Sequence, residues 1–240
     1  MKGLILAAGR GRRMGDETEA RPKGMVELRG RPLIAWQLEA LRGAGVHPVA
    51  IVRGYRADGL PFDVPTFDNP RWAETNMVSS LACAADWLLE GPTVVSYADL
   101  VYPPEAVAAL LDAPGDVAIT CDPGWLALWQ QRFEDPLSDA ETLRIDDEGR
   151  VVDIGRRPER LDEVEAQYMG LLKLTAPGAA RLLAHHRALP AADRDRIDLT
   201  TLLRRSIAAG DSVHAVHYRG WWCEVDSPSD LAVADRVVPR

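Results

Sequence analysis

The chain has 240 residues, of which 47% are hydrophobic, and its formal net charge is −8. This length can bury one substantial core, no apolar run is long enough to cross a bilayer, and the acidic balance argues against a nucleic-acid-binding face, so we expect neither a membrane nor a nucleic acid as partner. Cys83, Cys121 and Cys223 are far apart and lack CxxC spacing, which predicts no disulfide framework or zinc cluster and favours a reducing, cytoplasmic setting.

The first half of the chain alternates short apolar runs with helical patterns, which is typical of a sheet covered by helices on both faces. The expected elements are a strand at Leu4–Ala8, a helix over Leu33–Arg42, a strand at Pro48–Val52, a helix over Met77–Leu89, a strand at Thr93–Tyr97, a helix over Pro104–Leu111 and a strand at Val117–Cys121. This β-α-β-α-β-α-β order predicts parallel strands joined by right-handed crossovers.

The middle of the chain has a different pattern. In LRIDDEGRVVDIG, apolar and polar residues alternate around Asp147-Glu148-Gly149, which is a hairpin signature, and QYMGLLKLT adds another strand. We therefore expect a small antiparallel β insert over roughly residues 122–175. The remaining elements are helices over Ala176–Arg187 and Leu199–Ala209, a strand at Val213–Tyr218 and a helix over Pro228–Arg236. The predicted fold class is α/β, with a doubly wound, mostly parallel sheet in a single domain over residues 1–240.

The segment LAAGRGRRMG follows the first strand with glycine and arginine. Glycines let successive backbone N–H groups converge on an anion, and arginine adds charge-assisted bonds to phosphate, so Gly9, Gly11 and Arg13 fit a phosphate-binding loop. The spacing matches neither the P-loop nor the dinucleotide fingerprint, and an ordinary turn is the alternative interpretation. Lys23 follows Pro22, which fixes the backbone before it, and could neutralise charge on a reacting phosphorus.

Acidic residues follow the strand at Thr93–Tyr97 and precede the last helix. Asp99 lies just past that strand, and Glu224 and Asp226 come before Ser227, which marks the helix start. Two carboxylates that meet over a triphosphate would hold Mg²⁺, which takes hard oxygen ligands. The alternative is that Asp99 caps a turn and Asp226 only favours a helix N-terminus.

Together, LAAGRGRRMG, TEARPKGMVEL and GRPLI resemble the nucleotidyltransferase superfamily, which joins a nucleoside monophosphate to a phosphorylated small molecule. The resemblance implies a Rossmann-like nucleotidyltransferase fold, a loop that holds the triphosphate and a lysine that contacts the α-phosphate. By position, the nucleotide-binding residues are Leu6, Ala7, Ala8, Gly9, Gly11, Arg12, Arg13 and Lys23, with Lys23 and Arg13 as catalytic residues. The same resemblance makes Asp99 and Asp226 the ligands of Mg²⁺.

A narrower resemblance covers most of the chain. ETNMVSSLACA, SYADLVY, QYMGLLKLT and GWWCEVDSPSDL are similar to segments of the cytidylyltransferases that act on phosphocholine and small phosphonates. This resemblance adds Asn76 and Ser80 to the nucleotide or acceptor pocket and implies CTP and a small phosphonate or phosphoalcohol as partners, with a homodimer as a further expectation. A sugar-1-phosphate nucleotidylyltransferase is the alternative enzyme, because it shares the loop and the lysine. A nucleotide-binding regulatory module is disfavoured, because both the lysine and the metal aspartates are kept.

The expected acceptor pocket combines aromatic and acidic residues. Trp129 and Tyr168 with Glu224 would suit an ammonium group through cation–π contacts, and Asp139 and Glu141 could also bind a cationic acceptor or a second metal. Core packing of the tryptophan and solvent exposure of the two hairpin acids are the competing interpretations. Because DPLSDAETL also resembles enzymes that accept uncharged hydroxyalkylphosphonates, ammonium selectivity is only slightly favoured.

Overall fold

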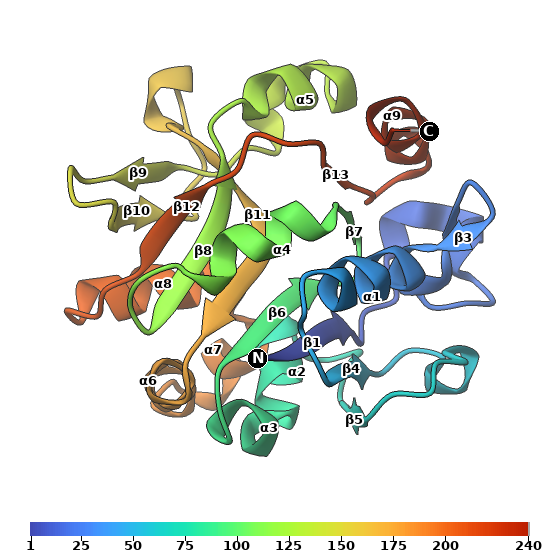
Figure 1. The fold of residues 1–240 in the computed structure, drawn as a ribbon, viewed down its shortest axis with the longest axis horizontal. Helices are drawn as coiled ribbons and strands as arrows, with labels where there is room; N and C mark the ends of the chain where they lie inside the picture. Colours follow the sequence, from blue (N-terminus) through green and yellow to red (C-terminus); the bar gives the residue numbers. More distant parts are fainter. Residues whose placement is uncertain (240) are drawn as a thin grey trace.

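The computed structural model describes residues 1–239, and its centre is a seven-stranded sheet (Figure 1). In spatial order the strands are β12 (His214–His217), β8 (Val117–Asp122), β11 (Gln167–Leu174), β6 (Thr93–Tyr97), β1 (Lys2–Ala7), β4 (Val49–Arg53) and β5 (Thr66–Asp68). Neighbouring strands pair in parallel except at β11, which is antiparallel to both β6 and β8.

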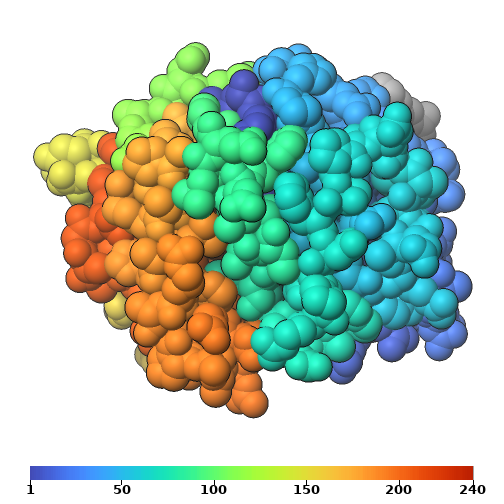
Figure 2. Space-filling view, turned by 90° about the horizontal axis from the view of Figure 1, so that it is seen from below, coloured from blue at the N-terminus to red at the C-terminus, as the bar shows by residue number. Residues whose placement is uncertain are grey.

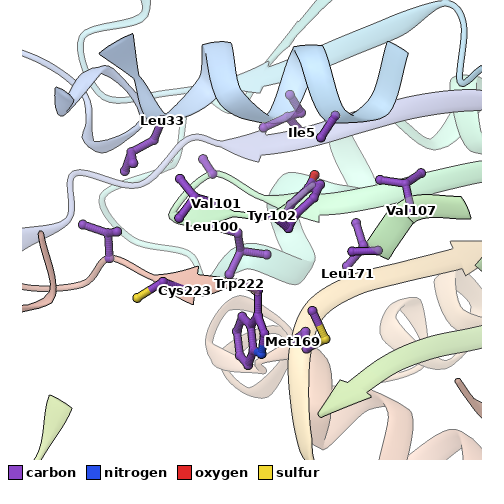
Figure 3. Packing of buried hydrophobic residues seen from close by; sticks show 14 of the residues in the cluster. Ile5, Leu33, Leu100, Val101, Tyr102, Val107, Met169, Leu171, Trp222 and Cys223 are labelled. Carbon is purple, nitrogen blue, oxygen red and sulfur yellow. The ribbon is translucent and has the colours of Figure 1, made fainter. Parts of the chain in front are cut away.

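Helices cover both faces of this sheet. One face carries α1 (Leu33–Gly43), α4 (Pro104–Leu111), α5 (Trp125–Arg132) and α9 (Pro228–Val237), and part of its core is drawn in Figure 3. The other face carries α2 (Met77–Cys83), α3 (Ala85–Leu89), α6 (Ala176–Arg187) and α8 (Leu199–Ala208). Alternate residues of β1 divide between the two cores, with Ile5 in one and Leu4 in the other, as a strand buried on both faces requires. The predicted α/β class with a doubly wound, mostly parallel sheet is confirmed.

Three small antiparallel ladders lie outside the central sheet. They are β9 (Leu143–Ile145) with β10 (Val151–Ile154), β13 (Cys223–Glu224) with β7 (Leu100–Val101), and β2 (Glu27–Leu28) with β3 (Arg31–Pro32). The first of these is the predicted hairpin. The placement of QYMGLLKLT in the antiparallel insert is wrong, because β11 lies inside the central sheet, where nearly all of its residues are buried.

The helical prediction over Met77–Leu89 also needs correction. The chain leaves helical geometry at Ala84, where φ is −101° and ψ is 26°, and continues as a second helix. The N–H of Ala84 bonds to the carbonyl of Leu81, three residues back, which tightens the last turn of α2. Two helices, α5 and α7 (Ala191–Arg196), were not predicted. Figure 2 shows the α6–α7 segment, in orange, beside the green α2–α3 segment.

The sheet topology places the predicted site residues at one edge. Leu6 of β1 pairs in parallel with Tyr97 of β6, so the glycine loop and Asp99 leave the sheet at the same end. The β13–β7 ladder then draws the last acidic segment toward the same point, because the N–H of Val225 bonds to the carbonyl of Asp99 at 2.8 Å. Parallel topology and one small ladder thus gather residues that are far apart in the sequence.

The structure also bears on the expectations about membrane spans and cysteines. No helix among residues 1–239 has both the length and the apolar character that a membrane span requires. All three cysteines are free thiols, Cys83 exposed and the other two buried. The single-domain boundary and the homodimer stay predictions.

Candidate active site

The glycine loop and Lys23 pack directly against each other. Gly11 has a φ of +72°, and a Cβ at this position would come within 2.7 Å of the Lys23 side chain. Only glycine therefore fits both the backbone conformation and the space. Lys23 is the first residue of a short 3-10 helix, and Pro22 before it has an extended backbone. In this arrangement the Lys23 side chain lies against Gly11 of the loop. Most of the lysine is buried, at 9% exposure.

A first cavity opens between this loop and the start of α2. Eight of the predicted nucleotide-binding residues line it, namely Leu6, Ala7, Ala8, Gly9, Gly11, Lys23, Asn76 and Ser80. The Ser80 hydroxyl accepts a hydrogen bond from Asn69, and the Asn76 side chain caps α2 by accepting from the N–H of Met77. Arg12 is exposed and lies outside this lining, while Arg13 lines a second cavity. The structure thus gathers most of the predicted nucleotide residues around one hollow.

The ammonium of Lys23 lies between two of the predicted metal ligands. It donates to Asp99 Oδ2 at 2.7 Å and also to Asp226 Oδ1. Burial lowers the pKa of Lys23, but the charges of Asp99 and Asp226 outweigh it, so the pKa lies above its ordinary value. Burial likewise acts to raise the pKa of Asp226, yet the neighbouring Lys23 holds it below its ordinary value. Lys23 and Asp226 are therefore both charged at neutral pH.

Glu224 completes an acidic cluster with Asp99 and Asp226, and one carboxylate oxygen of each lies within 4.8 Å of the others. Asp99 Oδ1 is buried and has no hydrogen-bond partner among the described residues. A buried carboxylate oxygen without a partner is costly unless something binds it. The donor set consists of hard oxygen ligands, which fits Mg²⁺. Burial and the charge of Asp226 raise the pKa of Glu224.

Arg132 is a buried cation that pairs with one member of this cluster, a role that was not predicted from the sequence. Its side chain has no exposed surface, and it donates to Glu224 at 3.0 Å and to Asp230 at 2.9 Å. Asp230 in turn accepts from the backbone N–H groups of Asp226 and Ser227, as part of the capping box that begins α9. One buried guanidinium thus holds both the side chain of Glu224 and, through Asp230, the backbone of a proposed metal ligand.

A second cavity lies on the other side of the acidic cluster. All five predicted acceptor residues line it, namely Trp129, Tyr168, Glu224, Asp139 and Glu141. Sequence reasoning missed several polar or aromatic residues of this lining, namely Tyr97, Gln167, Asp198 and Thr200. The only early signal for Asp198 was its position just before a helix, where its side chain caps α8. Burial raises the pKa of Glu141 to about 7, and this residue accepts a hydrogen bond from Thr200 at 3.2 Å.

Trp129 belongs both to the core and to the second cavity. It is 3% exposed and packs against Trp125 and Trp222, and the guanidinium of Arg132 lies 4.9 Å from its ring centre. Figure 3 shows Trp222 near Met169, and both line the same cavity. The Trp129 ring therefore already makes a cation–π contact with Arg132.

The two cavities meet at the lysine–aspartate contacts. Met77 and Tyr97 line both cavities, and the ion pair joins Lys23 of the first to Asp226 of the second. Arg13 lies at the same junction, 2.5 Å from Asp226 and 3.6 Å from Asp139. Ligands in the two hollows would therefore face each other across one lysine, one arginine and the acidic cluster.

Several known proteins are similar to this chain in sequence or in fold. The CTP:phosphoglutamine cytidylyltransferase of Campylobacter jejuni is 36% identical over 97% of this chain and 98% of its own length, and the 2-aminoethylphosphonate cytidylyltransferase of Lancefieldella rimae is 28% identical over 97% and 91%. The CTP:phosphocholine cytidylyltransferase of Streptococcus pneumoniae has a similar fold, with a TM-score of 0.73 at 20% identity over 99% of both chains. The inositol-1-phosphate CTP transferase of T. maritima gives 0.78 at 18% over 98% and 95%. Residues 3–194 match the family model of the MobA-like NTP transferase domain, so the chain belongs to this family and is a nucleotidyltransferase.

Proposed function

We propose that this protein transfers CMP from CTP to a small phosphonate or phosphoalcohol and releases pyrophosphate. The observation that carries the proposal is the meeting of two cavities at Lys23, Asp99 and Asp226, because the reaction joins two phosphorus-bearing ligands at one point. The choice of CTP rests on relatives that are named as cytidylyltransferases and align with nearly the whole chain.

In this reaction an acceptor oxygen forms a bond to the α-phosphorus of CTP, and the bond from that phosphorus to the bridging oxygen of pyrophosphate breaks. The acceptor oxygen is already anionic near neutral pH, so no general base is needed, and catalysis consists of alignment and charge neutralisation. In our proposal Lys23 stabilises negative charge on the α-phosphate, and Arg13 at the cavity junction stabilises charge on the phosphates beside it.

We propose that the first cavity holds the nucleotide. The glycine loop offers backbone N–H groups to the triphosphate, with Leu6, Ala7 and Ala8 leading into it, and the exposed Arg12, next to Gly11 in sequence, is a further candidate for phosphate contact. Asn76 and Ser80 line the far wall of the same cavity. Asp99 and Asp226 would hold Mg²⁺, which when bound neutralises phosphate charge. The buried, unpartnered Asp99 Oδ1 supports this assignment.

The second cavity is the proposed acceptor site. Trp129 and Tyr168 provide its aromatic wall. Glu141 is better placed than Asp139 or Glu224 to bind an ammonium, because Asp139 already lies near Arg13 and Glu224 is paired with the buried Arg132. An acceptor such as 2-aminoethylphosphonate or phosphocholine would thus have both apolar contact and a carboxylate partner. An uncharged acceptor such as 2-hydroxyethylphosphonate would use the same wall as an apolar surface.

A sugar-1-phosphate acceptor is the second candidate. Gln167, Asp198 and Thr200 line the second cavity, and these are side chains of the kind that read sugar hydroxyls. A glucose-1-phosphate thymidylyltransferase of Streptomyces griseus is also a relative, at 24% identity over 99% of this chain. The aromatic residues of the same cavity favour the smaller acceptors.

Pyrophosphate release tests the proposal directly. The full chain is assayed with each of four nucleoside triphosphates against 2-aminoethylphosphonate, 2-hydroxyethylphosphonate, phosphocholine, phosphoglutamine and glucose-1-phosphate. We expect turnover with CTP and at least one of the first three acceptors, in the presence of Mg²⁺. A clear preference for glucose-1-phosphate would establish the second candidate, and a clear preference for a nucleotide other than CTP would overturn the cytidylyl assignment.

A further inference from the structure

The ammonium of Lys23 occupies the space between carboxylates that the proposed metal would need. It takes Asp99 Oδ2 and Asp226 Oδ1, while Arg13 takes Asp226 Oδ2. Of the four carboxylate oxygens on these two aspartates, three are therefore engaged by side-chain cations of the protein. The fourth, Asp99 Oδ1, has no partner, so a metal ion that binds both aspartates must displace a cation of the protein, Lys23 or Arg13, from Asp226.

Lys23 cannot leave these partners without finding another anion. Its side chain is only 11% exposed, and a buried ammonium without a counter-ion is strongly disfavoured. Lys23 also lines the first cavity, where the proposed nucleotide would bring its phosphates within reach. The lysine therefore has two alternative sets of anionic partners, the aspartates on one side and the nucleotide phosphates on the other.

The residue type suits a cation that changes partners. Only three of the 28 basic residues in the chain are lysines, and Lys23 is the one at the active site, among arginines. A lysine ammonium is a compact charge on a flexible stem, whereas an arginine is a planar fork with a fixed geometry. Gly11 leaves the space through which this stem passes.

We propose that Lys23 is an internal counter-ion that occupies the carboxylates of Asp99 and Asp226 until the nucleotide binds, so that metal and nucleotide bind with positive coupling. This inference rests on the proposed function for the identity of the ligand in the first cavity. Nucleotide phosphate draws the lysine away from the aspartates, which frees them for the metal, and by linkage the metal strengthens nucleotide binding to the same degree. In the absence of nucleotide, the lysine keeps metal affinity low.

Mn²⁺ titration of the full chain, followed by electron paramagnetic resonance, tests the first half of the proposal without nucleotide. We expect Lys23→Met to bind Mn²⁺ at least about tenfold more tightly than the wild type, within the usual range of coupling between sites. Lys173→Met is the matched control, because Lys173 is also buried but donates to the carbonyl of Ala113. Its Mn²⁺ affinity should equal that of the wild type. Asp226→Asn in the Lys23→Met background should abolish the gain, which locates the ion.

The second half uses CMP, which carries the α-phosphate but chelates Mn²⁺ far more weakly than a triphosphate. Saturating CMP should tighten Mn²⁺ binding about fivefold or more in the wild type and leave Lys23→Met unchanged. Circular dichroism and thermal unfolding establish that the variants fold, and Lys23→Gln replaces Lys23→Met if the latter does not. Equal or weaker Mn²⁺ binding by the lysine variant without nucleotide overturns the proposal. Failure of the pyrophosphate assay with CTP overturns the proposed function instead and leaves this nucleotide-free result valid.

Discussion

The two cavities are built in different ways. The nucleotide-side cavity is lined entirely within the first 99 residues, by residues 6–11 and 23–24 at and after the end of β1, residues 72–80 around the start of α2 and residues 97–99 at the end of β6. The acceptor-side cavity draws its lining from segments spread over most of the chain, around positions 13, 77, 97–100, 129, 139–141, 167–170, 198–200 and 222–226. A ligand site of the first kind can be recognised from a local motif, whereas a site of the second kind depends on tertiary packing. Mutations should therefore affect the two sides differently.

The acids between the cavities should give the largest effect, because both sides depend on them. Asp99→Asn and Asp226→Asn each remove a charged oxygen ligand, and we expect either to abolish Mg²⁺-dependent pyrophosphate release. Activity is measured over a Mg²⁺ titration. Asp235→Asn is the control, because Asp235 lies on the same helix that follows Asp226 but pairs with Arg29 on the surface. Activity retained at ordinary Mg²⁺ in either variant would remove that residue from the metal site.

The second-largest effect should come from mutation of Arg132, the buried arginine on the acceptor side. Arg132→Met leaves Glu224 and Asp230 without their cation, and breaking a buried ion pair in this way costs about 3–5 kcal/mol of unfolding free energy. Urea unfolding followed by circular dichroism measures the change. Arg29→Met is the matched control, since Arg29 contacts the other end of α9 and is partly exposed. An equal loss of stability in both variants would contradict a special role for the buried ion pairs of Arg132.

Lys23→Ala should lower turnover by about 10²- to 10³-fold, as expected when one group that stabilises transition-state charge is removed. The lysine stands at the junction, so its loss should reduce turnover with every acceptor by a similar factor. Single-turnover rates at saturating CTP and Mg²⁺ measure this effect. Turnover within tenfold of the wild type would show that Lys23 makes no such contact.

The parts of the fold that were predictable carry local signals. The Ser227–Asp230 capping box marks the start of α9, and the turn at residues 147–149 marks the β9–β10 hairpin. By contrast, α5 begins after Gly124 with no side-chain cap, so its start has no signal in the sequence. The position of β11 was misjudged because the strand follows the hairpin in sequence, although its run of buried residues on both faces is typical of a central strand.

The same distinction holds for the site. Gly11 and Lys23 are found from the sequence because a loop and a short turn bring them together. Arg132 could not be found, because an arginine at a helix end is ordinarily exposed, and its burial depends on contacts with segments about 90 residues later. Thr200 likewise acquires its contact with Glu141 only when α8 packs over the sheet. Long-range pairing of this kind has no local pattern.

A smaller effect is expected in the pH dependence of acceptor binding, which should leave the nucleotide side unchanged. Because burial raises the pKa of Glu141 to about 7, this carboxyl is protonated below that pH and charged above it. The KM for 2-aminoethylphosphonate, relative to that for 2-hydroxyethylphosphonate, should therefore fall as pH rises from 6 to 8. The second compound is the control for titration of the phosphonate itself, and Glu141→Gln should remove the difference. The same raised pKa also affects the stability of the fold. Because folding favours the protonated carboxyl of Glu141, this residue stabilises the fold at low pH, and that contribution is lost as pH rises through about 7.

The aromatic wall should give the smallest effect. Tyr168 lines the acceptor cavity, is only half-buried and makes an edge contact with Tyr97, so Tyr168→Leu removes aromatic surface at moderate structural cost. If its ring contacts an acceptor ammonium, the preference for 2-aminoethylphosphonate over 2-hydroxyethylphosphonate should weaken by about 2- to 30-fold, the range of one cation–π contact.

Trp129→Phe should change the same preference less, because the guanidinium of Arg132 already lies over the Trp129 ring. Competition between the two phosphonates for each purified variant measures both effects. If Tyr168→Leu leaves the preference unchanged, or if the wild type uses both acceptors equally, the wall acts as an apolar surface and the ammonium has no aromatic partner here. That result would leave the nucleotide side and the acids at the junction unaffected, because Tyr168 contacts neither the glycine loop nor Lys23 through any described hydrogen bond.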